Sequence, residues 1–285
     1  MDEMVLKGQR WVNATYRGRT GYLPCQESGR TGWSTMFSLT RALQIELGLP
    51  EPSDSFGDAT MKALTAFGNV SYKTANRNIK TIAEAALYCK GYAGGALDGT
   101  FTTQTETGIL TMLANMGVPN SNGPLSVVVT PKLFKAMLNM DAYVPLPGGT
   151  ERIRTVQQEL NRNYTSRPQF LFGPCDGLFS RNLQKALVYA LQFEMGLDSS
   201  KVDGLMGPST MAGLTSQALV GLGSKDAGES GFVRLFNAAL ACNRYAGATG
   251  TAASAFSSAT VTTTKAFQEF CRLPKTGKAA LRISA

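Results

Sequence analysis

The feature that most constrains this chain is an internal repeat, because its second half repeats its first. The segment L-T-R-A-L-Q-I-E-L-G-L at residues 39–49 matches L-V-Y-A-L-Q-F-E-M-G-L at residues 187–197 in seven of eleven positions, at an offset of 148 residues. Further along, A-A-L-Y-C at residues 85–89 matches A-A-L-A-C at residues 238–242 at an offset of 153, a drift that loop insertions would produce. A repeat of this length sets the organisation of the whole fold. The sequence therefore predicts two homologous halves, residues 1–146 and 147–285.

Each half is predicted to divide again into two units of three helices. Apolar residues at helical spacing, such as Ile153, Val156 and Leu160, mark the first helix of a unit. The second helix is expected at residues 181–195, ended by Gly196, and the third opens with an early proline, as in M-G-P-S-T at residues 206–210. No set of strands stands out. The predicted fold class is all-α, with four three-helix units at residues 1–72, 73–146, 147–222 and 223–285, arranged as two homologous pairs; the third helix of the last unit is clipped or altered.

Asp-Gly turns connect the predicted helices. The sequence has D-G-T-F-T at residues 98–102 and D-G-L-F-S at residues 176–180. The aspartate is expected to cap the next helix, the glycine to take a positive φ, and the phenylalanine to fill the space between helices. All three roles are structural, and contact with a ligand is the alternative. The candidate ligand-binding residues of these turns are Asp98, Gly99, Phe101, Asp176, Gly177 and Phe179, joined by Asp203 and Gly204 of a further Asp-Gly turn.

Aromatic side chains are a second source of candidate ligand contacts, because sugar rings present apolar C–H faces on which an aromatic ring stacks. Tyr92 and Tyr245 recur in the equivalent turns Y-A-G-G and Y-A-G-A of the two halves. Packing in the core is the alternative role for either tyrosine. Both are included among the candidate ligand-binding residues.

The chain contains no histidine, which removes whole classes of mechanism. Ser-His-Asp hydrolases, Cys-His peptidases and His-ligated zinc amidases all need that side chain. Paired carboxylates, as in glycosidases, are the common hydrolytic chemistry that remains easy to assemble. Glu46 and Glu194 occupy the same place in the two repeats and invite that interpretation, but a solvated glutamate on a helix face is the simpler one, and Gln44 and Gln192 beside them are expected to be structural or exposed. The sequence predicts no catalytic residue, no metal site and no cofactor.

The five cysteines follow the repeat. Cys25 corresponds to Cys175 and Cys89 to Cys242, while Cys271 has no counterpart. One disulfide in each half, Cys25–Cys89 and Cys175–Cys242, is one alternative. The odd total and an N-terminus without a basic start or an apolar stretch of signal-peptide length favour free, buried thiols.

The turns and helices together resemble the peptidoglycan-binding-domain-like fold, a three-helix module attached to many bacterial and phage cell-wall hydrolases. The resemblance is carried by the two D-G-x-F-[ST] turns and by A-F-Q-E-F-C-R-L-P-K-T-G at residues 266–277. More specifically, the start of the chain, R-A-L-Q-I-E-L-G and A-L-Y-C-K-G-Y are similar to repeats that precede a glycoside-hydrolase-like barrel in actinobacterial and Gram-positive cell-wall proteins. The resemblance implies a binding array without that barrel, for which a chain of this length has no room.

These observations favour a non-catalytic array that binds peptidoglycan or an acidic wall polymer and targets an associated activity to the wall. The net charge of +8 suits such a polyanionic partner, whereas the scattered basic residues and the lack of a known motif argue against nucleic acid. A scaffold that docks a protein partner or cargo in a phage or secretion particle, and a carboxylate-dependent muramidase-like hydrolase, are the alternatives. No apolar stretch is long enough to span a membrane as a helix, and no membrane partner is expected. The expected location is the cell wall or the exterior, with the cytoplasm as an earlier location for a protein that is released or loaded into a particle.

Overall fold

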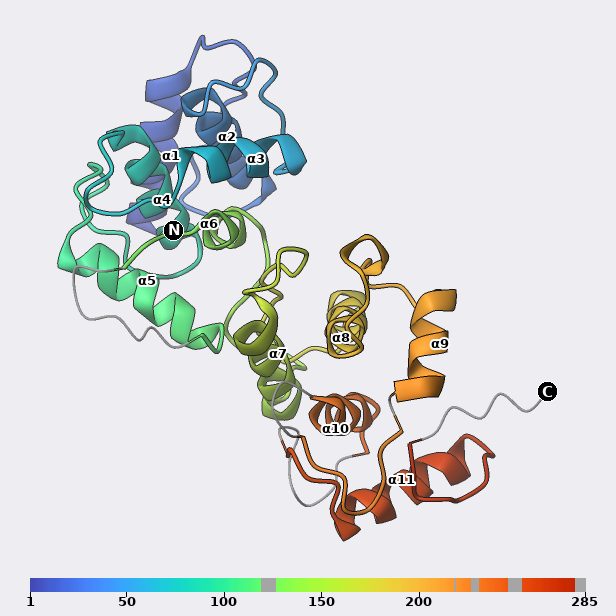
Figure 1. The fold of residues 1–285 in the computed structure, drawn as a ribbon. Coiled ribbons are helices and arrows are strands. Elements are labelled where there is room, and N and C mark those ends of the chain that lie inside the picture. Colours follow the sequence, from blue (N-terminus) through green and yellow to red (C-terminus); the bar gives the residue numbers. More distant parts are fainter. Residues whose placement is uncertain (119–126, 218, 227–230, 246–252, 280–285) are drawn as a thin grey trace. The chain divides into compact units, whose positions relative to one another are not determined.

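The structure, a computed structural model, describes residues 1–118, 127–217, 219–226, 231–245 and 253–279. These residues form eleven α-helices and one short 3-10 helix, with three isolated bridges in place of any strand or sheet (Figure 1). The predicted all-α class is therefore confirmed. The chain divides into two compact units, Met1–Ala142 and Tyr143–Ala285. The finer division into four three-helix units stays a prediction.

The first compact unit is built around one central helix. Its helices are α1 (Glu3–Tyr16), α2 (Trp33–Glu46), α3 (Asp58–Phe67), α4 (Arg77–Cys89), α5 (Thr103–Asn115) and α6 (Pro131–Met137). Helix α4 contacts α1, α2, α5 and α6, and every residue from 79 to 87 is buried. Small side chains allow this close packing: the Cβ of Ala85 lies 3.2 Å from the point where a Cβ on Gly8 of α1 would stand. Apolar and small residues form most of this covered surface, and Lys80, Thr81 and Glu84 are its buried polar members.

Helix α6 covers one face of this unit, where it packs on α3 and α4. An antiparallel bridge between Val70 and Val129 brings the chain to the first residue of the helix, and the Thr130 side chain accepts from the amide of Leu133. Pro131 stands at the first turn, as the sequence predicts. The helix packs on α3 and α4, and its residues Leu133, Phe134, Ala136 and Met137 are buried.

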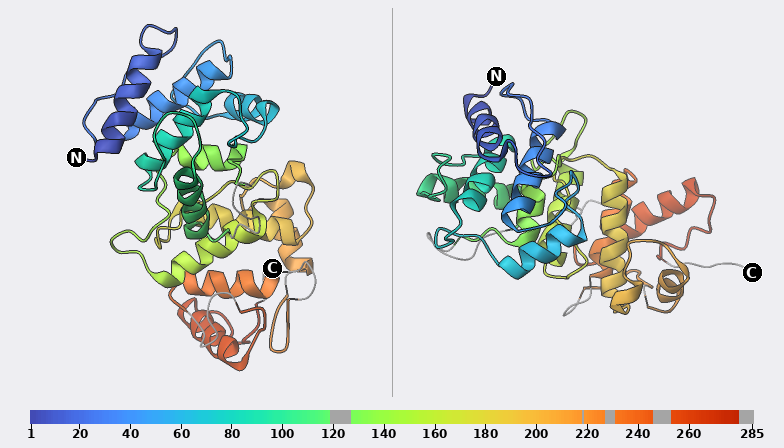
Figure 2. Two further views of the ribbon diagram at one scale, coloured as in Figure 1. Left: turned by 90° about the vertical axis from the view of Figure 1, so that its left-hand side faces the viewer. Right: turned by 90° about the horizontal axis from the view of Figure 1, so that it is seen from above.

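The second compact unit has a core formed by α7 (Glu151–Tyr164), α8 (Arg181–Glu194) and α10 (Phe232–Cys242). The left view of Figure 2 shows α10 alongside α7. Along the chain, the 3-10 helix η1 (Ser199–Lys201) and helix α9 (Pro208–Gln217) follow α8 and precede α10. Helix α11 (Ser258–Phe270) packs on α10. Stacked aromatic rings fill the core around Tyr164, whose ring centre lies 5.9 Å from those of Phe170 and Phe193.

The helix boundaries follow the sequence signals closely. Helix α8 covers the expected segment, and Gly196 takes a φ of +63° directly after it. Helix α9 opens at Pro208, inside the predicted M-G-P-S-T turn. A bridge between Val220 and Ala279 repeats the Val70–Val129 bridge of the first unit. The third helix that the sequence predicts for the last unit, residues 278–285, falls mostly on residues 280–285, outside the described part of the chain.

All five cysteines are free thiols, and Cys25, Cys175 and Cys242 are buried. The favoured expectation of free thiols agrees with the structure, but the expected burial is wrong for Cys271, which is exposed, and only partial at Cys89. Burial raises the pKa of Cys89 to about 12 and that of Cys242 to about 11, so both stay protonated near neutral pH. No helix among the described residues is both long and apolar enough to cross a membrane.

Candidate functional site

The Asp-Gly turn at residues 176–178 is held by a buried glutamine of the preceding helix. The Gln157 side-chain oxygen accepts from the amide of Gly177 at 2.8 Å, and its nitrogen donates to Asp176 Oδ1 at 2.7 Å and to the Leu178 carbonyl at 3.1 Å. One side chain therefore fixes three consecutive residues of the turn. The Gly177 amide is buried, so this bond replaces the one it would make to water.

The same arrangement recurs through the chain. Gln192 of α8 accepts from the Gly204 amide at 2.9 Å and donates to Asp203 Oδ1, the Leu205 carbonyl and Thr210 Oγ1. Gln9, Gln44 and Gln268 each accept from a turn amide and donate to a carbonyl and a threonine hydroxyl in the same way. The expectation that Gln44 and Gln192 are structural or exposed resolves to structural, because both are almost wholly buried. We call these four side chains and Gln157 the turn clamps.

The turn at residues 98–101 has a carboxylate in place of the amide. Glu84 of α4 is wholly buried, and its oxygens accept from the amides of Gly99 at 2.9 Å and Phe101 at 3.2 Å. Leu97 and Phe101 take the left-handed φ values +59° and +50°, which are uncommon for residues with a side chain. The two bonds from Glu84 hold this backbone in place. Burial raises the pKa of Glu84, although the two backbone donors act to lower it.

We expect Glu84→Gln to remove a pH dependence from the stability of the first unit. The folded state holds a proton on Glu84 more tightly than the unfolded chain does, so wild-type stability falls as the pH rises above about 4.5, the ordinary value. The difference in unfolding free energy between the variant and wild type should therefore shift in favour of the variant as the pH rises from about 4.5 to 7. Urea unfolding followed by the fluorescence of the two tryptophans, both in this unit, measures the difference. Glu51→Gln, at an exposed position, serves as the control. A gap between variant and wild type that does not change with pH would contradict the assignment.

The aspartates of these turns do not cap the following helices, and this part of the sequence prediction is wrong. Asp98 Oδ1 accepts from the amide and hydroxyl of Thr100, and these bonds, the hydroxyl first, lower the pKa of the carboxyl. Helix α5 is capped by Thr102, and α8 is capped by Ser180. The physical reason is that the aspartate side chain is short. Its carboxyl group accepts from the backbone amide two residues further along, which forms a local Asx turn and leaves the carboxyl group too far from the first amides of the helix.

The glycines of the turns take the positive φ values that the sequence predicts. Gly99, Gly177 and Gly204 have φ of +74°, +77° and +72°. Backbone atoms also leave no room for a side chain at two of them, since a Cβ would stand 2.4 Å from the Arg77 carbonyl oxygen at Gly99 and 2.8 Å from the Thr150 amide at Gly177. All three glycines are buried.

The two phenylalanines of the turns differ. Phe101 is buried between helices as expected, but Phe179 is 41% exposed, so the prediction that it fills the core is wrong. The left-handed backbone at Phe101 has no counterpart at Phe179, which explains why equivalent residues point differently. Two aspartates of the turns, Asp98 and Asp203, are exposed. The side chain of Asp203 accepts a hydrogen bond from the turn clamp Gln192, whereas no turn clamp binds Asp98.

The two candidate tyrosines lie in packed surroundings. Tyr92 is buried, and its hydroxyl oxygen accepts from Asn115 Nδ2 at 3.2 Å. Tyr245 is half-buried against α11, with its ring centre 5.4 Å from that of Phe267. Their positions give each a packing contact, and a part of the Tyr245 ring remains accessible.

The structure brings the candidate residues together in small groups only. Tyr92, Asp98, Gly99 and Phe101 share one loop of the first unit. In the second unit the turn at residues 176–179 precedes α8 and is held by Gln157 of α7. The turn at residues 203–204 packs against Lys185 and Tyr189 of α8 and is held by Gln192. The candidate residues therefore lie in several turns, each held by its own helix.

The paired glutamates Glu46 and Glu194 are bound by neighbouring side chains and backbone. Glu46 accepts from the hydroxyl of Tyr16 at 2.8 Å and from the side-chain amides of Asn76 and Asn78. Glu194 accepts from the hydroxyl of Tyr164 and from the backbone amide of Gly231. Both are partly buried, so the expectation of a solvated glutamate is wrong, because each joins helices within its own unit. The described residues contain no cluster of three or more acidic or cysteine side chains that could hold a metal ion.

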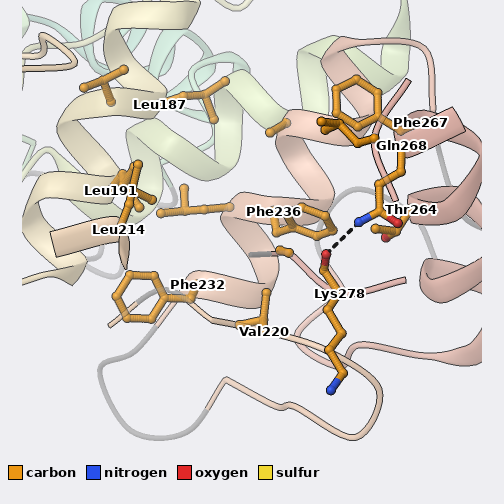
Figure 3. Close-up of a pocket in the computed structure, with 15 residues that line it drawn as sticks. Leu187, Leu191, Leu214, Val220, Phe232, Phe236, Thr264, Phe267, Gln268 and Lys278 are labelled. Carbon is orange, nitrogen blue, oxygen red and sulfur yellow. Dashed lines mark hydrogen bonds between the residues drawn. The ribbon is translucent and has the colours of Figure 1, made fainter. Parts of the chain in front are cut away.

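A large apolar pocket in the second unit is a feature that the sequence analysis missed. It has a volume of about 370 Å³ and lies between α8, α9, α10 and α11 (Figure 3). Its lining is formed by aliphatic and aromatic side chains, chiefly Leu187, Leu191, Leu214, Phe232, Phe236 and Phe267. The apolar periodicity that predicts a buried helix face is the same for a helix that lines a pocket. The sequence therefore carries no signal that separates the two.

Two of the comparisons with known proteins name the same two relatives. Residues 146–285 match the family model described as the FadG/YbfG, PGDB-like domain, where PGDB denotes a peptidoglycan-binding-like domain. The whole chain is similar to the "Uncharacterized protein FadG" of Bacillus subtilis (strain 168), with 46% identity over 280 residues, and to the "Uncharacterized protein YbfG" of the same strain, with 39% identity over 279 residues.

The chain spans less than half of either relative. The alignments cover 98% of this chain but 47% of FadG and 36% of YbfG. No solved structure matches the chain significantly. The second half of the chain, with its clamped Asp-Gly turns, is thus similar to a peptidoglycan-binding-like domain.

Proposed function

We propose that this chain is a non-catalytic array that binds peptidoglycan and brings an attached or associated activity to the bacterial cell wall. The observation that carries the proposal is the match of residues 146–285 to a peptidoglycan-binding-like domain. The recurrence of clamped turns in both compact units supports more than one binding position along the chain. Such a protein works at the wall or outside the cell.

Separate, weak sites suit a polymeric ligand. Linked sites that engage one polymer gain affinity over each site alone, provided that the polymer offers ligands at matching separations. Peptidoglycan repeats the same disaccharide and stem peptide, and it meets that condition. The net charge of +8 favours walls that also carry acidic polymers.

The surroundings of the glutamates support a binding role over hydrolysis. A glycosidase of the common kind needs two carboxyl groups on either side of the scissile bond, one of which must be able to give up a proton to the sugar. Glu46 and Glu194 instead accept bonds from neighbouring side chains and backbone that tie helices together.

Sedimentation with purified sacculi tests the proposal. The protein should pellet with sacculi at low ionic strength, and removal of acidic wall polymers should weaken the binding without abolishing it. A protein that stays in the supernatant with both preparations would overturn the proposal. Raising the salt concentration separates the contribution of net charge, which salt screens, from that of the specific sites.

Two exposed aspartates provide the matched variants. Asp98→Asn and Asp203→Asn keep a side-chain oxygen for the turn but remove the charge that faces solvent. If these turns contact amino groups of the stem peptides, each variant should bind sacculi a few-fold more weakly. The double variant should bind about tenfold more weakly, because the losses of affinity at two linked sites multiply. Glu51→Gln, an exposed charge change away from the turns, should bind as wild type does. Wild-type binding by the double variant would exclude these aspartates as ligand contacts.

A further inference from the structure

A lysine, an asparagine and an aspartate meet near the end of the first compact unit. Lys90 directly follows the last residue of α4, and Asn139 and Asp141 follow α6. Because α4 and α6 pack against each other, residues 49 positions apart in the sequence lie side by side. All three residues are partly buried and belong to the same unit. Their contact is therefore fixed by the packing of two helices.

The amino group of Lys90 is held against the side-chain amide of Asn139. Its Nζ lies 2.8 Å from Asn139 Oδ1 and 2.6 Å from the backbone carbonyl oxygen of Asp141. Since an amide C=O bond is about 1.2 Å long, Nζ is at most about 4 Å from the Cγ carbon of Asn139. That separation approaches the value of about 3–3.5 Å for two atoms that are positioned to react.

Asp141 contributes two further groups to the Asn139 amide. Its backbone amide donates to Asn139 Oδ1 at 3.0 Å, and its carboxyl oxygen Oδ2 accepts from Asn139 Nδ2 at 2.8 Å. The first bond would stabilise the negative charge that develops on Oδ1 when a nucleophile attacks Cγ. The second places a carboxyl group, which can transfer a proton, on the nitrogen that would have to leave.

The surroundings of Lys90 favour the neutral amine, which is the nucleophilic form of a lysine. Burial lowers the pKa of Lys90 to about 8, although the charge of Asp141 and the thiol of Cys89 act to raise it. A larger fraction of this lysine is therefore able to react near neutral pH than of an exposed lysine.

We propose that Lys90 and Asn139 form an isopeptide bond within the first unit. The lone pair of Lys90 Nζ attacks Cγ of Asn139, the bond between Cγ and Nδ2 breaks, and Nδ2 leaves as ammonia. The carboxyl group of Asp141 passes to Nδ2 the proton that Nζ loses, so atoms and charges balance without an oxidant or a co-reactant. The product is an amide that joins the end of α4 to the segment after α6. Such a link restricts the unfolded chain in the way that a disulfide does.

The second unit does not repeat this lysine. The segment A-A-L-Y-C-K at residues 85–90 corresponds to A-A-L-A-C-N at residues 238–243, so Asn243 stands in the place of Lys90. Asn243 is exposed, and its side chain donates to the Ala239 carbonyl of the preceding helix. The repeat therefore does not require a lysine at the end of this helix.

The mass of the intact full chain provides the direct test. After incubation at about pH 8, where half of Lys90 is neutral, we expect a mass that is lower than that of the sequence by one molecule of ammonia. Cyanogen bromide cleaves after methionine, so residues 62–112, which contain Lys90, should stay joined to residues 138–140, which contain Asn139. A chain with the mass of its sequence, or separate fragments, would overturn the proposal.

Variants assign the three roles. Lys90→Arg keeps the positive charge but not the nucleophile, and Asn139→Ala removes the carbon that is attacked, so both should have the mass of their sequence. Asp141→Asn removes the group that transfers the proton and should leave most of the protein without the bond, and complete bond formation in this variant would contradict that role. Lys7→Arg is the matched control, because Lys7 also donates to a backbone carbonyl in this unit, and it should keep the loss of ammonia. Circular dichroism shows which variants are folded, and the joined fragments of the wild-type chain decide the outcome if Lys90→Arg is not.

An asparagine can also lose ammonia by reacting with its own backbone to form a succinimide. A loss of ammonia that persists in Lys90→Arg, without joined fragments in the wild-type chain, would identify that reaction and overturn the proposal. Because none of these measurements involves sacculi, failure of the isopeptide bond and failure of wall binding are distinguished.

Discussion

Replacing Gln192 by leucine is expected to lower the free energy of unfolding of the second compact unit by about 3 kcal/mol. Its side chain has no exposed surface and makes four hydrogen bonds, to the Gly204 amide, Asp203, the Leu205 carbonyl and Thr210. Leucine has a similar size but no polar atoms, so it would leave buried turn groups without partners. Each such group costs about 1–3 kcal/mol.

The measurement uses a property of the sequence. Both tryptophans, Trp11 and Trp33, belong to the first unit, so their fluorescence follows that unit alone, while far-ultraviolet circular dichroism follows both. In urea the variant should lose the helical signal of the second unit at lower denaturant, with the tryptophan transition unchanged. Gln184→Leu, at an exposed position of the same helix, is the control and should change stability by less than about 0.5 kcal/mol. Equal effects of the two substitutions would show that the clamp does not stabilise the turn.

Gly108→Ala is expected to destabilise the first unit by about 3 kcal/mol, although the same change in an exposed helix stabilises. Alanine is favoured over glycine in a helix by about 1 kcal/mol. A Cβ at Gly108 of α5, however, would stand 1.9 Å from the carbonyl oxygen of Ala93. That atom belongs to the backbone of the loop that carries Tyr92 and Asp98, so it cannot move without displacing the loop. Overpacking of this kind costs about 1–3 kcal/mol or more.

Gly213→Ala in α9 is the matched control for Gly108→Ala. A Cβ there would meet the side chain of Met195, with its sulfur 2.5 Å away, and a flexible methionine can rotate aside. We expect the cost at Gly213 to be under half of that at Gly108. Tryptophan fluorescence in urea reports the first change, and circular dichroism reports the second. A stabilising effect of Gly108→Ala would mean that the loop yields easily and does not fix its turn.

The helices of this protein could be predicted from the sequence because their signals are local. The early prolines at Pro131 and Pro208 and the glycine at Gly196 stand where helices begin and end in the structure. The left-handed glycines of the turns were equally predictable, because only glycine adopts that backbone freely. The turn clamps could have been found from the repeat, since Gln9 aligns with Gln157 and Gln44 with Gln192, but a repeated glutamine alone does not say what it binds.

The candidate site was less predictable, because its properties depend on distant neighbours. Phe101 and Phe179 occupy equivalent positions in one motif, yet one is buried and the other exposed. The sequence predicts that Glu46 and Glu194 are solvated, but tyrosine hydroxyls from the preceding helices donate hydrogen bonds to them. Similar local sequences were placed in different surroundings by the helices that pack around them.

The sequence by itself determined the all-α class, the repeat and the positions of helix ends, because periodicity, caps and breakers act over a few residues. Only the tertiary structure decided which apolar positions are covered. Leu39 and Leu43 lie beneath packed helices in the first unit, while Leu187 and Leu191, in nearly the same local sequence, line an open pocket in the second. Burial is a property of what packs against a residue, and that partner comes from far along the chain or from another protein.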